Sequence, residues 1–370
     1  MDHKKKTLEE LDAKLGNASS LNALIGLDGF VDKIIHPVAK RHGKGDNFER
    51  MQTITEFAER IGAAAGRSTN IELYPVVDKL GGNGPIMANA LLSQGLNVRY
   101  IGALGEPNIH PVFEEFAKKT QAISLANPGV THACEFDDGK IMFGSTASLE
   151  NIAYEQVIEV MGEGAFFDAV SRAHLMGIVN WTMIPNMTAY LNALVERVLP
   201  NLPTLNKRVF FFDLCDPQKR SESDLLGVLN TIKKFQSHGH TILGLNYAEG
   251  QQVDRVLGGD GDGEGPDKLQ RLAARVRGEL GIGCVVVHPT HSAACATKND
   301  TSYVDGPFCQ KPKITTGAGD HFNSGFASAQ LLGLSPEASL TVAVSTSGYY
   351  VRTAKSPSLN DISTFIRNWQ

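Results

Sequence analysis

Short apolar runs alternate with helical patterns along most of this 370-residue chain, and that alternation restricts its fold more than any other feature. Runs that are apolar on both faces suit central parallel strands covered by helices, and they occupy residues 24–27, 98–101, 174–179, 209–212, 241–245 and 284–287. Helical patterns lie between them, at residues 85–94, 187–198, 223–236 and 268–280. We therefore predict an α/β fold with a doubly wound, mainly parallel central sheet flanked by helices.

Two regions depart from this pattern and alternate like exposed antiparallel strands. They lie at residues 70–78 and 131–147, and the second turns at Asp137-Asp138-Gly139. With a further strand at residues 30–36, we expect them to form a small β-sheet lid over one end of the main sheet.

A helical insertion is predicted at residues 47–65. One face of that helix would carry Met51, Ile54, Ala58 and Ile61 and would dock on the core or on a partner subunit. The length of the chain suits one large α/β unit with insertions, so we predict a single domain over residues 1–370.

Composition and charge narrow the classes of partner. The net charge is −5 and the pI about 6.1, so there is no broad basic field to attract nucleic acid or anionic lipid. The sequence has neither a secretory signal nor a run of the ~20 apolar residues that span a membrane. The cysteines are dispersed without a CxxC pair, as in proteins with reduced thiols. We expect a cytoplasmic protein with no nucleic-acid or membrane partner.

The segment 315–320, Thr-Thr-Gly-Ala-Gly-Asp, is the strongest candidate for chemistry. Its two glycines allow a tight turn, and an apolar helical stripe follows, so the turn opens a helix whose first N–H groups can bind an anion. Asp320 in that first turn is placed to accept the proton of an attacking hydroxyl. The alternative is a glycine-rich turn in which Asp320 only complements the helix dipole.

A second glycine-rich segment, Gly81-Gly82-Asn83-Gly84-Pro85, precedes another predicted helix. Pro85 suits the first helical position, and the glycines permit close packing against a bound molecule. The Asn83 amide offers a donor and an acceptor to a polyol. The alternative is that Asn83 caps the helix.

Polar residues also follow other predicted strands. Asn246 and Glu249 form either a capping box or a phosphate site with a hydrated Mg²⁺. Asp28 and Asp32 follow the first strand, where carboxylates can accept hydrogen bonds from sugar hydroxyls. Residues 213–220 add further polar groups to the same edge of the sheet.

Together these motifs resemble the ribokinase-like (PfkB) family of carbohydrate and nucleoside kinases, from about residue 24 to residue 356. Gly-Gly-Asn at 81–83 matches the N-terminal signature of that family, and Thr-Thr-Gly-Ala-Gly-Asp at 315–320 matches its C-terminal signature. Asn246-x-x-Glu249 falls at the family's Asn-x-x-Glu motif. Residues 216–220 resemble its Asp-Pro-Asn-x-Arg segment, with Gln in place of Asn.

The resemblance implies ATP-dependent transfer of the γ-phosphoryl group to a sugar hydroxyl, with Mg²⁺ as cofactor. It makes Asp320 the base, and it places the anion hole at Gly317, Ala318 and Gly319. Phosphate and water-bound Mg²⁺ would be organised by Asn246, Glu249 and Thr316. The acceptor would be held by Asp32, Gly82, Asn83 and Asp28. Family members often dimerise through the lid, which makes a homodimer the corresponding expectation here.

Two departures limit what can be carried over. The family usually has Asp before the Thr-Thr-Gly-Ala-Gly-Asp run, where this chain has Ile314, so dependence on a monovalent cation is left open. Near the nucleotide, members often have Thr-x-Gly, where this chain has His288-Pro289-Thr290. Nucleotide contacts at that place are therefore not transferred.

Other functions fit parts of the pattern. A nucleoside kinase would need an aromatic shelf for the base, for which Phe30 and Phe143 are the candidates. An ADP-using sugar kinase belongs to the same superfamily. A catalytically silent sugar-binding protein would be expected to lack the base that Asp320 supplies. An oxidoreductase is disfavoured because no G-x-G-x-x-G follows the first strand.

Overall fold

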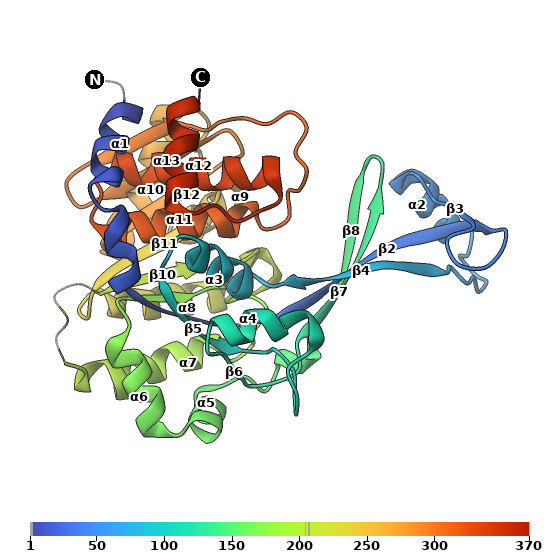
Figure 1. The fold of residues 1–370 in the computed structure, drawn as a ribbon, viewed down its shortest axis with the longest axis horizontal. Coiled ribbons are helices and arrows are strands. Elements are labelled where there is room, and N and C mark those ends of the chain that lie inside the picture. The colour runs from blue at the N-terminus through green and yellow to red at the C-terminus, as the bar shows by residue number, and fades with distance from the viewer. Residues whose placement is uncertain (1–2, 204, 206–207, 370) are drawn as a thin grey trace.

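The computed structural model describes residues 3–203, 205 and 208–369, and within them nine strands form one large sheet (Figure 1). From one edge to the other, the strands are β14 (Thr301–Asp305), β13 (Ser292–Thr297), β12 (Cys284–His288), β11 (His240–Asn246), β10 (Val209–Asp213), β9 (Leu175–Ile178), β1 (Asn22–Leu27), β5 (Asn97–Gly102) and β6 (Ile123–Ser124). The pairs from β6 to β12 are parallel, and β13 and β14 are antiparallel additions at one edge.

Helices cover both faces of this sheet. One face packs against α5 (Tyr154–Met161), α6 (Glu163–Arg172), α7 (Met187–Ala193), α8 (Glu222–Phe235), α9 (Tyr247–Val256) and α10 (Pro266–Leu280). The other packs against α1 (His3–Asp12), α3 (Asn83–Ser93), α4 (Glu114–Lys119), α11 (Ala318–Leu332), α12 (Pro336–Thr353) and α13 (Leu359–Asn368). Central strands such as β10 are buried along their whole length because both faces are covered. The predicted doubly wound α/β class is confirmed.

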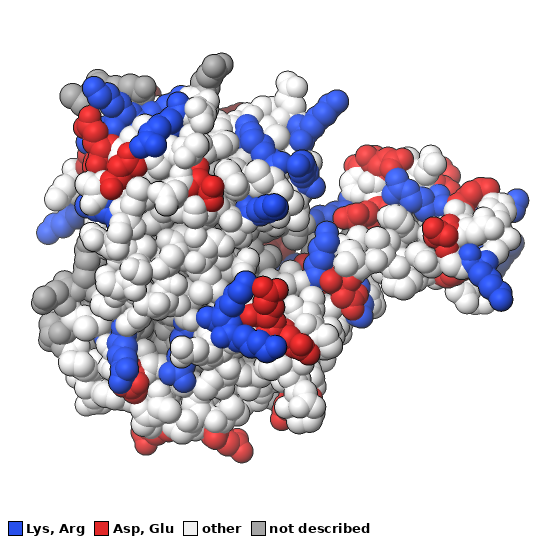
Figure 2. Space-filling view, in the orientation of Figure 1, with Lys and Arg blue, Asp and Glu red and all other residues white. Residues whose placement is uncertain are grey.

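A separate small sheet projects from this body as a narrow arm (Figures 1 and 2). Its strands are β2 (Phe30–Arg41), β3 (Phe48–Arg50), β4 (Leu73–Gly81), β7 (Gly129–Phe136) and β8 (Gly139–Ser145). Strand β2 begins shortly after β1 leaves the main sheet, and β4 leads directly into α3. The small sheet is therefore tied to the end of β1 and to the beginning of α3, which meet where the Asn83 and Gly84 amides donate to Asp28.

The predicted helix at 47–65 is wrong over its first part. Residues Phe48–Arg50 form β3, which pairs with the end of β2, and only α2 (Ile54–Gly62) is helical. Thr53 caps α2 by accepting a hydrogen bond from the Glu56 amide, so the helix cannot extend further back. The face that docks carries Ile54 and the buried Phe57, whereas Ala58 and Ile61 are exposed.

The helix after Gly-Gly-Asn also begins earlier than its sequence pattern indicates, at Asn83 rather than at Pro85. In the part of the chain that the structure describes, no helix is both long and apolar enough to cross a membrane.

Candidate active site

The turn before α11 is the centre of the site. Gly317 caps the helix with φ 85°, a left-handed conformation that favours glycine. The Ala318 amide donates to the Thr315 carbonyl (3.1 Å) and is therefore not a free donor. Gly319 lies in the first turn of α11, where N–H groups have no carbonyl partner inside the helix. Of the three predicted donors, the Gly317 and Gly319 amides therefore remain as candidates for binding an anion.

Asp320 faces the beginning of α3. Its Oδ1 accepts a hydrogen bond from Asn83 Nδ2 at 3.0 Å, so residues 237 positions apart are brought together. Asn83 makes no side-chain cap, because Gly82, with φ 96°, occupies the N-cap position of α3. The structure thus favours a site role for Asn83 over the capping alternative.

Asp28 lies beneath the same helix end, with no exposed surface. Its Oδ1 and Oδ2 accept hydrogen bonds from the Gly84 and Asn83 amides, and Asn180 Nδ2 donates to Oδ2 at 2.6 Å. Burial raises the pKa of Asp28 to about 6, against the lowering effect of these donors. Its oxygens are used to hold α3, which argues against the predicted direct contact with an acceptor.

Asp32 lies on β2 in the small sheet, between Lys79 on β4 and Thr131 on β7. Its side chain is 9% exposed, and it is hydrogen-bonded to the Thr131 side chain. Burial raises its pKa, while Thr131 and the nearby lysines Lys140 and Lys79 oppose that shift. A Cβ on Gly81 would meet this carboxyl group at 2.4 Å, so glycine is needed there for the close approach.

Carboxylates are concentrated where the central strands end. Burial raises the pKa of Asp213, and the Glu249 charge raises it further. Burial also raises the pKa of Asp320 well above its ordinary value, with Asp213 and Asp28 adding to the shift. Asn83 opposes this shift by donating to the ionised form. The field of these acids favours a proton on Asp320, or a cation near it.

Asn246 and Glu249 form the capping box at the start of α9. Asn246 Oδ1 accepts from the Glu249 amide (3.0 Å), and Glu249 Oε2 accepts from the Asn246 amide (2.9 Å). The other oxygen of Glu249 accepts from the Asp216 amide (2.8 Å). Both oxygens therefore have backbone donors, and among the described residues no cluster of three or more acidic, histidine or cysteine side chains could hold a metal directly.

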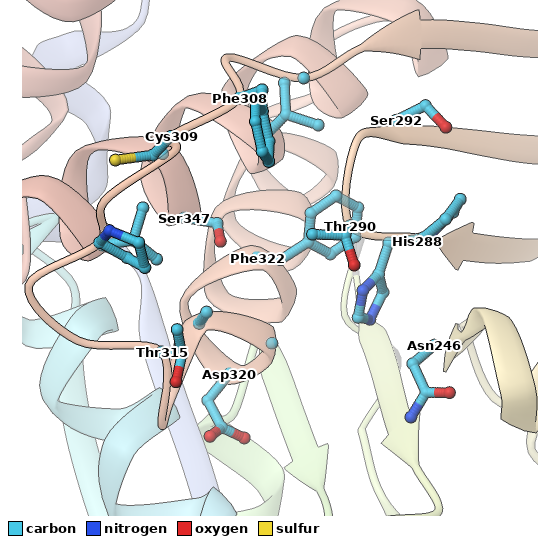
Figure 3. A pocket seen from close by; sticks show the side chains of 18 of the residues that line it. Asn246, His288, Thr290, Ser292, Phe308, Cys309, Thr315, Asp320, Phe322 and Ser347 are labelled. Atoms are coloured by element: carbon cyan, nitrogen blue, oxygen red, sulfur yellow. The ribbon is translucent and has the colours of Figure 1, made fainter. Parts of the chain in front are cut away.

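Two cavities meet at the turn before α11. The first, which we call the α12 cavity, has a volume of about 660 Å³. Figure 3 shows Asp320 at one end of it, Asn246 and His288 across from it, Phe308 of the loop after β14 at the other end, and Ser347 of α12 between them. The second, the small-sheet cavity, has a volume of about 1170 Å³ and lies between the arm and the body. Thr315 lines both.

The comparisons with known proteins agree with this arrangement. Residues 1–369 match the family described as prokaryotic ketohexokinase. The chain belongs to this family. It is also 27% identical over 344 residues to a ketohexokinase from Haloferax volcanii, covering 92% of this chain and 90% of that protein. The predicted ribokinase-like carbohydrate kinase, a phosphotransferase with an alcohol acceptor, is confirmed.

Solved structures place the family in the ribokinase fold. An Arabidopsis thaliana ribokinase complexed with ribose and ATP matches 94% of this chain and 98% of its own, with TM-score 0.63 and 15% identity. A Methanocaldococcus jannaschii nucleoside kinase matches 94% of this chain and 98% of its own, with TM-score 0.62 and 14% identity. At these identities the likeness concerns the fold alone.

Sequence reasoning missed two residues of this kinase's site. Lys140, at the start of β8, contacts the Thr316 hydroxyl with its Nζ, so the small sheet places a cation beside the turn. His288 at the end of β12 packs against the Phe322 ring (centroids 4.4 Å apart), and burial lowers its pKa to about 4. Lys140 follows directly after the Asp-Asp-Gly turn, but no local pattern indicates that this hairpin reaches α11.

The candidate aromatic shelf for a nucleoside base does not line either cavity. Phe30 is buried in the core, and Phe143 is 48% exposed and lies near the Phe57 ring. The structure therefore offers nothing in support of the nucleoside alternative at these positions.

Proposed function

We propose that this kinase phosphorylates a hydroxyl group of a ketohexose, with ATP as donor. The observation that carries the proposal is the position of the turn at residues 315–320, which separates the α12 cavity from the small-sheet cavity. Each cavity, of about 660 Å³ and about 1170 Å³, is large enough to hold a small-molecule ligand. The name of the Haloferax volcanii relative supports a ketohexose as the acceptor.

The nucleotide occupies the α12 cavity in this proposal, with its γ-phosphate at the turn before α11. Apolar side chains that suit a base line this cavity, among them Val344, Val351 and Phe308, and Phe308 lies at the end away from Asp320. At the other end, the Gly317 and Gly319 amides donate to the phosphoryl oxygens on which charge develops. In this arrangement ATP lies along α12, with its γ-phosphate beside Asp320.

The acceptor occupies the small-sheet cavity, where Asp32 lines the wall, and extends to the turn, where Asn83 and Asp320 line the adjoining end of the α12 cavity. Asp320 accepts the proton of the attacking hydroxyl while the new oxygen–phosphorus bond forms. The bond between the γ-phosphorus and the bridging oxygen breaks, and ADP leaves. Lys140 of the small sheet contacts Thr316, and in this proposal it offsets charge on the phosphoryl group.

Mg²⁺ enters with the nucleotide in this proposal. The Asp213 and Glu249 carboxylates line the α12 cavity, and the Glu249 charge raises the pKa of Asp213, a repulsion that a divalent cation relieves. Because the oxygens of Glu249 have backbone donors, contact through water suits this site and the preference of Mg²⁺ for retained waters. The ion neutralises phosphate charge when it is bound.

The small sheet acts as a lid over the acceptor and as a dimer contact. Large apolar side chains on it are exposed by 41–49%: Leu73, Val76, Val77, Met142 and Phe143. These side chains lie on β4 and β8, at the two edges of the sheet, and exposed apolar side chains on an arm are typical of a protein–protein contact that a second copy can supply. Light scattering after size exclusion tests this proposal, with a dimer expected for the wild type and a monomer for Val77→Glu with Met142→Glu.

A coupled ADP-release screen tests the activity. Ketohexoses, aldohexoses, pentoses and nucleosides are compared at equal concentration with MgATP. We expect a ketohexose to exceed the other classes by roughly tenfold or more in kcat/KM, the scale on which hydroxyl contacts discriminate. Equal turnover of nucleosides would contradict the acceptor assignment. The absence of acceptor-dependent turnover with any of the compounds would favour a catalytically silent sugar-binding protein.

A further inference from the structure

The turn before α11 is held by side chains as well as by backbone. The Gly317 carbonyl accepts hydrogen bonds from the His321 amide (3.1 Å) and lies 2.7 Å from His321 Nδ1. A carbonyl oxygen can only accept, so Nδ1 carries the proton. In the neutral ring Nε2 is then an acceptor, and it lies 2.9 Å from the Ser356 hydroxyl, which donates to it. The two hydrogen bonds therefore run in one direction, with Ser356 donating to His321 and His321 donating to the Gly317 carbonyl.

Tyr350 completes this arrangement from α12. Its ring stacks on His321, with centroids 3.5 Å apart and planes 13° apart. Its hydroxyl donates to the Thr316 carbonyl at 3.0 Å. Two consecutive carbonyls of the turn are thus fixed by side-chain donors. Burial lowers the pKa of His321 to about 4, so the ring is neutral at physiological pH and keeps this pattern of donors.

The surroundings of the turn do not suit the monovalent cation that the ribokinase-like family implies. Such an ion needs free oxygen ligands, but Ile314 offers none in its side chain. The Gly317 carbonyl already accepts from two donors of His321, and the Tyr350 hydroxyl takes up one of the two lone pairs of the Thr316 carbonyl. The neighbouring wall of the small-sheet cavity carries Lys140, Lys313 and Lys355, which repel a cation.

We propose that His321, Tyr350 and Ser356 are positioning residues that fix the anion-binding turn, and that this kinase consequently needs no monovalent cation. The inference rests on the proposed function for the role of the turn. It goes beyond the proposed function because it assigns to side chains the role of holding the turn in place, which a bound ion would otherwise have. All three side chains line the small-sheet cavity, and in this proposal they act on catalysis through the carbonyls of Thr316 and Gly317 rather than by binding the acceptor.

The first test compares potassium, sodium and tetramethylammonium chlorides at equal ionic strength. We expect kcat and kcat/KM to agree within about twofold in the three salts, because a larger difference would require a site-specific ion effect. The thermal midpoint is measured in the same series, without substrate. Activation by potassium of tenfold or more, or a saturable rise in midpoint with potassium alone, would overturn the proposal.

The second test uses variants. Tyr350→Phe keeps the stacked ring and removes only the hydroxyl, and His321→Ala removes the donor to Gly317. Each should lower kcat by about fivefold or more, the rate equivalent of one ordinary hydrogen bond. The acceptor Kd, measured by calorimetry, should be unchanged. Tyr349→Phe is the matched control, because Tyr349 packs edge-on against Phe365.

The outcomes separate the two proposals. A wild-type kcat for Tyr350→Phe would show that the hydroxyl does not position the turn. A parallel loss of kcat and acceptor affinity, with a lower melting midpoint, would indicate general stabilisation only. If the wild type phosphorylates no sugar, the proposed function fails, whereas the melting series still decides whether the turn binds potassium.

Discussion

The two cavities beside the α11 turn are built in different ways. The α12 cavity is formed by strands and helices of the main body, which share one packed core on each face of the sheet. The small-sheet cavity lies between that body and the projecting arm, so its residues come from two sheets. The first is preformed by the fold, whereas the second depends on where the arm lies, as in kinases whose lids close over substrate.

The largest effect is expected at the point where the two cavities meet. Asp320→Asn keeps the shape of the side chain and its contact with Asn83, but it cannot accept a proton. We expect kcat to fall by about 10³-fold, within the range for loss of a general base, while the acceptor Kd changes little. Stopped-time assays of ADP release and calorimetric titration with the acceptor measure the two quantities.

The pH dependence adds a second check on Asp320. Because burial and neighbouring acids raise the pKa of this carboxyl group, the ionised base forms only as the pH rises above the ordinary range for Asp. The wild-type kcat/KM should therefore increase with pH through that ionisation, and Asp320→Asn should lack the step. Asp46→Asn, an exposed change on the arm, is the control. A variant with wild-type kcat would exclude Asp320 as the base.

Lys140→Met tests whether the arm contributes to the chemistry or only encloses the acceptor. The lysine contacts Thr316, so removing its charge should lower kcat by about 10–100-fold, less than the loss of the base. Lys33→Met is the matched control, because Lys33 lies on β2 and pairs with the exposed Asp78. An unchanged kcat for Lys140→Met would reduce the arm to a cover, and the chemistry would then belong to the body alone.

The same contrast explains what the sequence could predict. Local apolar periodicity predicts the strands and helices of the body, and a short motif predicts the turn at 315–320. The α12 side of the site is therefore predictable from the sequence. Local motifs indicate Asn83 and Asp320 separately, whereas their contact depends on how α3 and α11 pack. Local patterns also misassigned Phe48–Arg50, because pairing with β2 outweighed helical periodicity there.

The residues that were missed or assigned differently owe their roles to contacts between distant segments. Lys140 acquires its role only because the β7–β8 hairpin reaches α11. Asp28 follows a strand, as an acceptor ligand would, but the amides of α3 take up its oxygens. The sequence motif does not reveal that the Ala318 amide is already bonded to the Thr315 carbonyl, because that bond depends on the backbone geometry of the turn. Composition and spacing carry none of this information.

The smallest effect tests the electrostatic character of the preformed side. Burial and Glu249 raise the pKa of Asp213, so at neutral pH the folded state favours the protonated carboxyl group more than the unfolded chain does. The free energy of unfolding should then fall as the pH rises from the ordinary Asp range toward the raised value. Asp213→Asn removes this dependence and retains an oxygen for the Asn323 amide.

We therefore expect the free energy of unfolding of Asp213→Asn, measured without nucleotide, to exceed that of the wild type by at least about 1 kcal/mol at pH 8 and by less at pH 5. Urea denaturation at the two pH values measures the difference. Asp262→Asn is the opposite control, because Lys268 lowers the pKa of that exposed carboxyl group, so its neutralisation should bring no gain that grows with pH. A gain for Asp213→Asn that is equal at both pH values would mean that packing, rather than charge, makes the α12 side costly to fold, and the contrast between the two cavities would lose its electrostatic part.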